Sequence, residues 1–158
     1  MAATDIETPL VLGPDLAGTL MTPKEFDAVE EVEEDWVYEL IKGVLVVSPP
    51  PLEAERGPNE MLGHLLIMYR EYHRRGKTLD GTLPEQYVRT PGSRRQADRV
   101  IWAGLGTQPN PRKDKPRIVV EFVSAGKRSR RRDYLEKRRE YLAAGILDTG
   151  SSIGFAEL

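Results

Sequence analysis

Cysteine is absent from this 158-residue chain, and histidine occurs only twice. The first absence excludes a disulfide framework and thiolate zinc ligands, and the second argues against a zinc site. No run approaches the roughly 18 consecutive apolar residues that a membrane-spanning helix requires. The first seven residues also lack the cationic and apolar parts of a signal peptide. These absences predict a cytoplasmic protein that does not enter a membrane.

Charge is unevenly distributed along the chain, although the formal net charge is only −2. Residues 1–35 hold ten acids against the single base Lys24, which leaves 22 bases against 15 acids in the remainder. The body of the protein is therefore cationic. Such a surface suits a polyanionic partner or is simply solvated, and composition alone leaves both readings open.

The length and the 39% hydrophobic content allow one ordinary core, so we expect a single domain. Residues 1–21 show no periodicity and contain scattered proline and glycine, which predicts a flexible leader. The domain itself is expected over residues 22–146. Its alternation of strand and helix patterns indicates an α/β fold.

Local signals place the expected elements of this domain. Threonine, proline and glutamate at positions 22, 23 and 25 predict a helix start with a capping box, and the helix should reach about Glu31. Two strand-like runs flank Lys42-Gly43, where glycine supplies the positive φ of a hairpin turn. The remaining expected elements are helices over residues 59–75 and 130–144, and strands over residues 85–89, 99–102 and 117–123.

Two carboxylates lie in or beside apolar runs and could carry chemistry. Glu121 interrupts the continuous apolar run 118–123, so it needs a cation, a hydrogen-bond donor or a proton. Asp98 directly precedes another apolar stretch. On neighbouring strands the two would offer oxygen ligands to a divalent cation such as Mg²⁺. The alternatives are an arginine-paired strand glutamate and an ordinary turn aspartate.

The last predicted helix adds a third polar group. Asp133, Lys137 and Tyr141 are spaced four residues apart and therefore share one helix face. A lysine beside the two carboxylates would balance negative charge on a phosphoryl transition state and orient the attacking water. The alternative is a surface pair between Asp133 and Lys137.

Basic residues are dense around the start of this helix. Residues 127–139 hold eight bases against two acids. Such density suits contact with phosphate groups, and the alternative is a solvated face. The predicted nucleic-acid contacts are Lys127, Arg128, Arg130, Arg131 and Arg132.

The order of these motifs resembles the Uma-type restriction endonuclease family, also known as domain of unknown function 820, of the PD-(D/E)XK nuclease superfamily. The resemblance covers residues 22–146. It rests on YELIKGVLVVSPPP at 38–51, ADRVI at 97–101, VVEFVS at 119–124, RDYLEK at 132–137 and YLAAGI at 141–146.

The resemblance implies a restriction-endonuclease-like fold, a central mixed β-sheet flanked by helices. It also implies that Asp98 and Glu121 are the two acidic motifs and that Glu39 is an accessory carboxylate. The superfamily lysine normally lies two residues after the second acid, where this chain has Val123. In this family the lysine moves to the following helix, and Lys137 fits that place. Ala97 replaces the usual proline before the first acid.

The end of the chain departs from the family pattern. Family members continue through an aromatic-rich strand, whereas this chain reads LDTGSSIGFAEL over residues 147–158. We therefore expect an atypical tail, with the final strand or strands missing or altered.

The resulting interpretation is a Mg²⁺- or Mn²⁺-dependent endonuclease that hydrolyses phosphodiester bonds in DNA. Asp98 and Glu121 would bind the metal, Lys137 would assist the water, and Glu39 would support the metal shell. Asp133 and Tyr141 would be accessory residues. The alternative is a catalytically inactive, truncated module that binds nucleic acid or another partner, or a folded remnant without activity. Cutting both strands of a duplex would favour a homodimer, although no residue indicates the oligomeric state.

Overall fold

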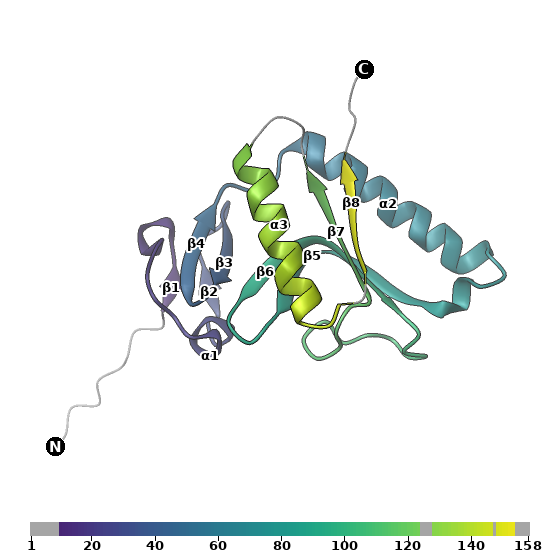
Figure 1. The fold of residues 1–158 in the computed structure, drawn as a ribbon, viewed down its shortest axis with the longest axis horizontal. Coiled ribbons are helices and arrows are strands. Elements are labelled where there is room, and N and C mark those ends of the chain that lie inside the picture. Colours follow the sequence, from purple (N-terminus) through teal and green to yellow (C-terminus); the bar gives the residue numbers. More distant parts are fainter. Residues whose placement is uncertain (1–9, 124–127, 147, 154–158) are drawn as a thin grey trace. The chain divides into compact units, whose positions relative to one another are not determined.

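The computed structural model describes residues 10–123, 128–146 and 148–153 (Figure 1). At residues 55, 123, 128–133 and 148–153 it describes the backbone but not the side chain. Contacts divide the chain into two compact units. Unit 1 comprises residues 1–50 and 91–94, and unit 2 comprises residues 51–90 and 95–158. Among the described residues, no helix combines the length and the apolarity needed to cross a membrane.

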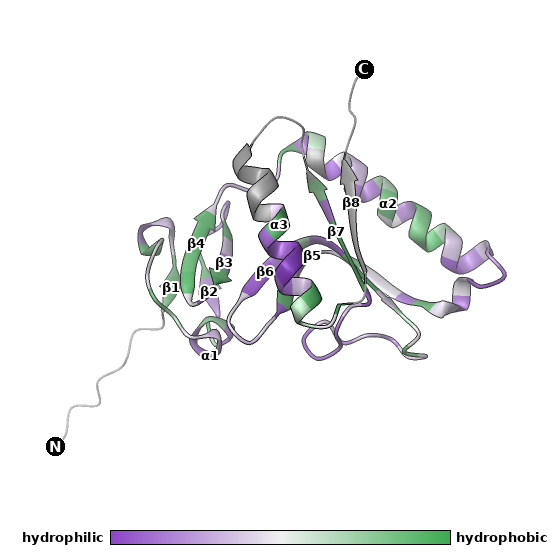
Figure 2. Cartoon of the chain, in the orientation of Figure 1, coloured by the Kyte–Doolittle hydropathy of each residue, from purple (hydrophilic) through white to green (hydrophobic). Residues whose placement is uncertain are grey.

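Unit 1 is built on the predicted hairpin of β3 (Val37–Ile41) and β4 (Val44–Ser48), which pair antiparallel. The turn residues Lys42 and Gly43 have φ values of 50° and 82°. Two successive positive φ values are typical of the tight turn whose twist matches that of paired strands. Figure 2 shows β4 in hydrophobic colours, and Leu45 at its centre is fully buried. The predicted hairpin is confirmed.

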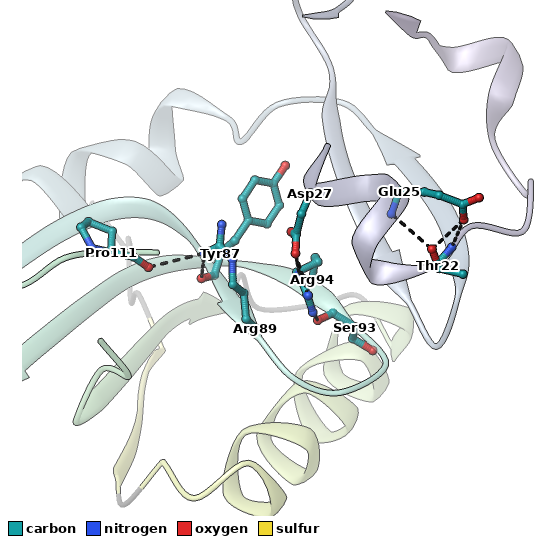
Figure 3. A network of polar contacts seen from close by, with 8 residues as sticks. All are labelled: Thr22, Glu25, Asp27, Tyr87, Arg89, Ser93, Arg94 and Pro111. Carbon is teal, nitrogen blue, oxygen red and sulfur yellow. Dashed lines mark hydrogen bonds and ion pairs between the residues drawn. The ribbon is translucent and has the colours of Figure 1, made fainter. Parts of the chain in front are cut away.

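The helix start predicted at Thr22 is also confirmed. In α1 (Pro23–Asp27), the Glu25 amide donates to Thr22 Oγ1 at 3.2 Å, and the Thr22 amide donates to Glu25 Oε2 at 2.7 Å (Figure 3). The Thr22 hydroxyl also donates to Glu25 Oε2 at 2.7 Å, and this bond, followed by the one from the Thr22 amide, lowers the pKa of Glu25 because both favour its charged form. The helix ends earlier than predicted. Its last residue, Asp27, receives a forked ion pair from Arg94, with the shortest contact at 2.7 Å.

Residues 10–21 have defined contacts, although the sequence predicted a flexible leader there. They contain β1 (Val11–Leu12), which pairs in parallel with β2 (Glu31–Val32), and the short 3-10 helix η1 (Pro14–Leu16). Leu12 is only 1% exposed, and the Gly18 amide donates to the Leu45 carbonyl at 2.8 Å. One buried side chain and a few backbone bonds leave no periodic signal, so pattern analysis did not detect this segment.

Unit 2 contains a mixed sheet of β5 (Leu79–Arg89), β6 (Arg94–Ala103), β7 (Ile118–Val123) and β8 (Asp148–Ile153), and only the first residue of β6 belongs to unit 1. β5 pairs with β6, β6 runs antiparallel to β7, and β7 runs parallel to β8. The predicted mixed sheet is confirmed.

Strand β8 lies inside the segment expected to be an atypical tail. It pairs with β7 over all six of its residues, so part of this segment forms a strand of the sheet. Its sequence, DTGSSI, has weak strand propensity. Backbone hydrogen bonds to β7 do not depend on side-chain type, which is why sequence patterns did not predict this strand.

Two helices cover opposite faces of this sheet. Val120 packs with Leu62 and Leu66 of α2 (Glu53–Tyr72), whereas Val119 packs with Tyr141 of α3 (Arg128–Ala143). Consecutive strand residues point to opposite faces, so α2 and α3 lie on opposite sides (Figure 1). α2 begins six residues before the predicted start, and α3 stops before Gly145 (φ 80°) as expected.

Candidate active site

Glu121 is a buried carboxylate on the α3 face of β7. Its side chain sits among apolar strand residues, and the residue is only 7% exposed. Tyr141 donates its hydroxyl to Glu121 Oε1 at 3.0 Å, and Lys137 Nζ lies 3.5 Å from Oε2. Both partners come from α3, one helical turn apart, as their spacing predicted. The expectation that this carboxylate needs a cation or a donor is confirmed, because it has both.

Lys137 connects this carboxylate to the neighbouring strand. Besides its contact with Glu121, its ammonium donates to the backbone carbonyl of Gln96 at 3.0 Å. The lysine side chain is only 12% exposed. Gln96 lies two residues before Asp98 on β6, so the cation stands where β6 and β7 adjoin. An ordinary surface lysine, the alternative reading, does not fit this burial.

Asp98 lies within β6, so the alternative of a turn aspartate is wrong. Its Oδ2 accepts a hydrogen bond from the backbone amide of Phe122 at 2.5 Å. Phe122 directly follows Glu121, so the carboxylate of Asp98 reaches the backbone of β7 next to Glu121. The carboxylate of Asp98 therefore lies against the backbone of β7 next to Glu121, whose own carboxylate Lys137 of α3 contacts.

The side chains of β6 change face around Asp98. Arg95 bonds to Glu140 of α3 at 3.0 Å, whereas Arg99 bonds to Asn59 of α2 at 2.6 Å. Residues four apart in a regular strand point to the same face. The strand must therefore be irregular between these two arginines, which is where Asp98 lies. Local irregularities of this kind re-aim side chains, and here the affected residue is a candidate ligand.

Arg95 was not singled out from the sequence, yet it joins β6 to α3. Its side chain is 0% exposed, and its guanidinium also donates from Nε to Glu140 Oε2 at 3.2 Å. Glu136 lies farther away, at 3.6 Å. Figure 2 shows the middle of α3 in hydrophilic colours. Glu140 belongs to that polar stretch, and its pair with Arg95 ties the helix that carries Lys137 to β6.

Several predicted residues are not tested by this geometry. Glu39 lies on β3 in unit 1, where it is 8% exposed, and its accessory role stays a prediction. Lys127 lies outside the described residues, and the side chains of Asp133 and of the helix-start arginines lie outside them too. The DNA contacts predicted for the basic residues therefore stay predictions. These residues are Lys127, Arg128, Arg130, Arg131 and Arg132. Within the described side chains, no group of three or more histidine, cysteine, aspartate or glutamate residues is arranged to hold a metal ion.

Comparisons with known proteins agree with the predicted resemblance. The family model described as "Uma2: Putative restriction endonuclease" matches residues 23–149. Among solved structures, a putative nuclease belonging to DUF820 from Anabaena variabilis ATCC 29413 is similar in fold, with a TM-score of 0.55 and 13% sequence identity. The likeness covers 74% of this chain and 66% of that chain, slightly under two thirds of its length. The comparison with curated proteins gives no match. The predicted restriction-endonuclease-like fold is confirmed.

Proposed function

Since the chain belongs to the Uma2 family of putative restriction endonucleases, we propose that it is a metal-dependent endonuclease that hydrolyses phosphodiester bonds in DNA. Family and fold point to a nuclease of the restriction-endonuclease type. The metal dependence, the DNA substrate and the roles of Asp98, Glu121 and Lys137 are the content of the proposal. A homodimer has no support in these findings.

One observation carries the assignment of the site. A partly buried ammonium, Lys137 Nζ, stands 3.5 Å from Glu121 and 3.0 Å from the Gln96 carbonyl, at the junction of the strands that bear the two acids. A purely structural role would be served by a single ion pair. The convergence of three charged groups from β6, β7 and α3 is the arrangement that phosphoryl chemistry requires.

The donor set fits a small, hard divalent cation. Proteins usually hold Mg²⁺ through one or two carboxylates, with water and substrate phosphate as the other ligands. Asp98 and Glu121 supply two carboxylates from adjacent strands, so a third protein ligand is not required. Each is already engaged by other groups, through the Phe122 amide and through Tyr141 and Lys137. The first contact holds the Asp98 carboxylate against β7, and the other two hold the Glu121 carboxylate against α3.

In this scheme, a bound Mg²⁺ or Mn²⁺ adds positive charge beside the phosphate and favours ionisation of water. Hydrolysis breaks one phosphorus–oxygen ester bond, while water gives its oxygen to phosphorus and a proton to the leaving oxygen. Lys137 would donate hydrogen bonds to the attacking water or to a phosphate oxygen and balance the developing charge. Tyr141 would keep Glu121 in place, because its hydroxyl bonds the oxygen that Lys137 does not contact.

The proposal is tested by nicking of supercoiled DNA with Mg²⁺ or Mn²⁺. Glu121→Gln and Lys137→Met keep side-chain size and remove charge, and each should lower the rate by roughly 100-fold or more. Glu136→Gln is the matched control on α3, since its side chain is 57% exposed, and it should cut at the wild-type rate. Thermal unfolding of all four proteins separates lost chemistry from lost folding.

Cleavage that survives both charge-removing substitutions would remove the assignment of these residues. Salt-dependent binding of DNA by the wild-type chain without any cleavage would instead favour a catalytically silent module, because phosphate contacts alone produce that dependence.

A further inference from the structure

Asn59 of α2 contacts two consecutive residues of β6, the backbone carbonyl of Asp98 and the side-chain guanidinium of Arg99. The residue is 8% exposed. Its Nδ2 donates to the Asp98 carbonyl at 2.7 Å, and its Oδ1 accepts from Arg99 Nε at 2.6 Å. The two bonds determine which end of the amide carries nitrogen, since exchanging them would place donor against donor and acceptor against acceptor.

Arg99 holds the side-chain amide of Asn59 in this orientation. It is 3% exposed, and burial lowers its pKa, opposed by the carboxylate of Glu60. Its guanidinium also donates to the Asn59 carbonyl at 3.0 Å and to Thr82 Oγ1 at 3.2 Å. A buried cation depends on such hydrogen bonds. Gly63 leaves room for it, because an added Cβ there would lie 2.6 Å from an Arg99 nitrogen.

Asp98 is consequently fixed at two points. Asn59 bonds its backbone carbonyl from the α2 side, and the Phe122 amide bonds its carboxylate from β7. The irregular stretch of β6 lies here, so the strand ladder alone does not define the backbone of Asp98. The regular pairing of β6 with β7 begins at Arg99, immediately after Asp98, and continues to Ile101.

We propose that Asn59 is a positioning residue, which fixes the carbonyl of Asp98 so that the carboxylate of Asp98 lies against β7 beside Glu121. Its consequence for metal binding rests on the proposed function. The positioning itself is a property of the cation-free protein and can be measured without any activity.

Asn59→Asp is the sharpest variant. It is nearly isosteric and keeps an oxygen for Arg99, with added charge attraction, but it removes the donor to the Asp98 carbonyl. Thr82→Val is the matched control, because it removes a contact of the same arginine and a bond to the Val100 carbonyl of β6, and leaves the bond between Asn59 and Asp98 intact. A general loosening of Arg99 would therefore affect both variants alike.

The first readout is hydrogen exchange of the Phe122 amide by NMR without metal, normalised to neighbouring amides of β7. In Asn59→Asp this exchange should become about tenfold faster, the effect of losing one hydrogen bond, while Thr82→Val should match wild type. The second readout is the affinity for Mn²⁺ alone, which should fall at least about tenfold in Asn59→Asp, as when other partners of metal ligands are removed.

Wild-type exchange at Phe122 in Asn59→Asp, or equal acceleration in Thr82→Val, would overturn the proposal. Absence of Mn²⁺ binding by wild type would refute the metal site of the proposed function, and the exchange result would still decide the role of Asn59. If Asn59→Asp does not fold, the double variant Asn59→Leu with Arg99→Leu removes the buried charge together with the amide. It should show the same faster exchange at Phe122.

Discussion

Replacing Glu140 by alanine should destabilise the protein strongly, because Arg95 would stay buried without its main partner. The Arg95 side chain is 0% exposed and Glu140 is 16% exposed, and two hydrogen bonds of 3.0 and 3.2 Å join them. Breaking a buried ion pair costs about 3–5 kcal/mol. Glu136, at 3.6 Å, can take over part of this interaction, although it is 57% exposed. We therefore expect a loss of about 2–3 kcal/mol in the free energy of unfolding.

For a chain of this length, that loss corresponds to a fall in Tm of roughly 4–12 °C. The assay is thermal unfolding followed by circular dichroism, supported by urea denaturation. Glu136→Ala is the control, and it should cost no more than about 1 kcal/mol because exposed ion pairs contribute little. Adding Arg95→Met to Glu140→Ala should recover stability, since the uncompensated charge is then removed.

The reasoning is refuted if Glu140→Ala lowers Tm no more than Glu136→Ala does. In that case the buried pair does not anchor α3, and the position of Lys137 would need another explanation. A loss of nicking in Glu140→Ala at temperatures where the protein remains folded would show that this anchor also supports the site.

Three further changes test individual contacts. Tyr141→Phe should cost about 1–3 kcal/mol in urea denaturation, because the buried Glu121 loses a donor, and an unchanged midpoint would contradict that contact. Thr22→Ala should raise the pKa of Glu25 toward 4.5 in a carboxyl NMR titration. Because the folded-state pKa is lowered, Glu25 stabilises the wild-type fold above pH 4.5 and loses this effect as pH falls through the folded-state pKa. The variant keeps only the bond from the backbone amide of residue 22, so this dependence should be weaker. Gly57→Ala in α2 should gain less than the roughly 0.5–1 kcal/mol that alanine usually adds inside a helix, because the ring of Pro58 crowds a Cβ on the helical residue before it, and a urea midpoint raised by the full amount would oppose this.

The family relation and the local structure reinforce each other at Lys137. Residue spacing placed Lys137 on the last predicted helix, and the resemblance added that this helical lysine takes the place of the one two residues after the second acid. The contact of 3.5 Å between Lys137 and Glu121 shows how a lysine on α3 reaches the acid of β7. The sequence pattern could show that Lys137 and Tyr141 share a helix face, but not which strand that face meets.

Residue types and their local spacing were enough to predict the hairpin around Lys42-Gly43 and the capping box at Thr22. They also singled out the carboxylates Asp98 and Glu121 in or beside apolar runs. Each depends on residues within about four positions of one another, where backbone geometry determines the contact directly. Only the tertiary structure decided what those candidates touch. Asn59 reaches Asp98 across 39 residues, and Lys137 reaches Gln96 across 41. No local periodicity encodes such separations. They arise because buried polar groups must find partners wherever packing brings two segments together.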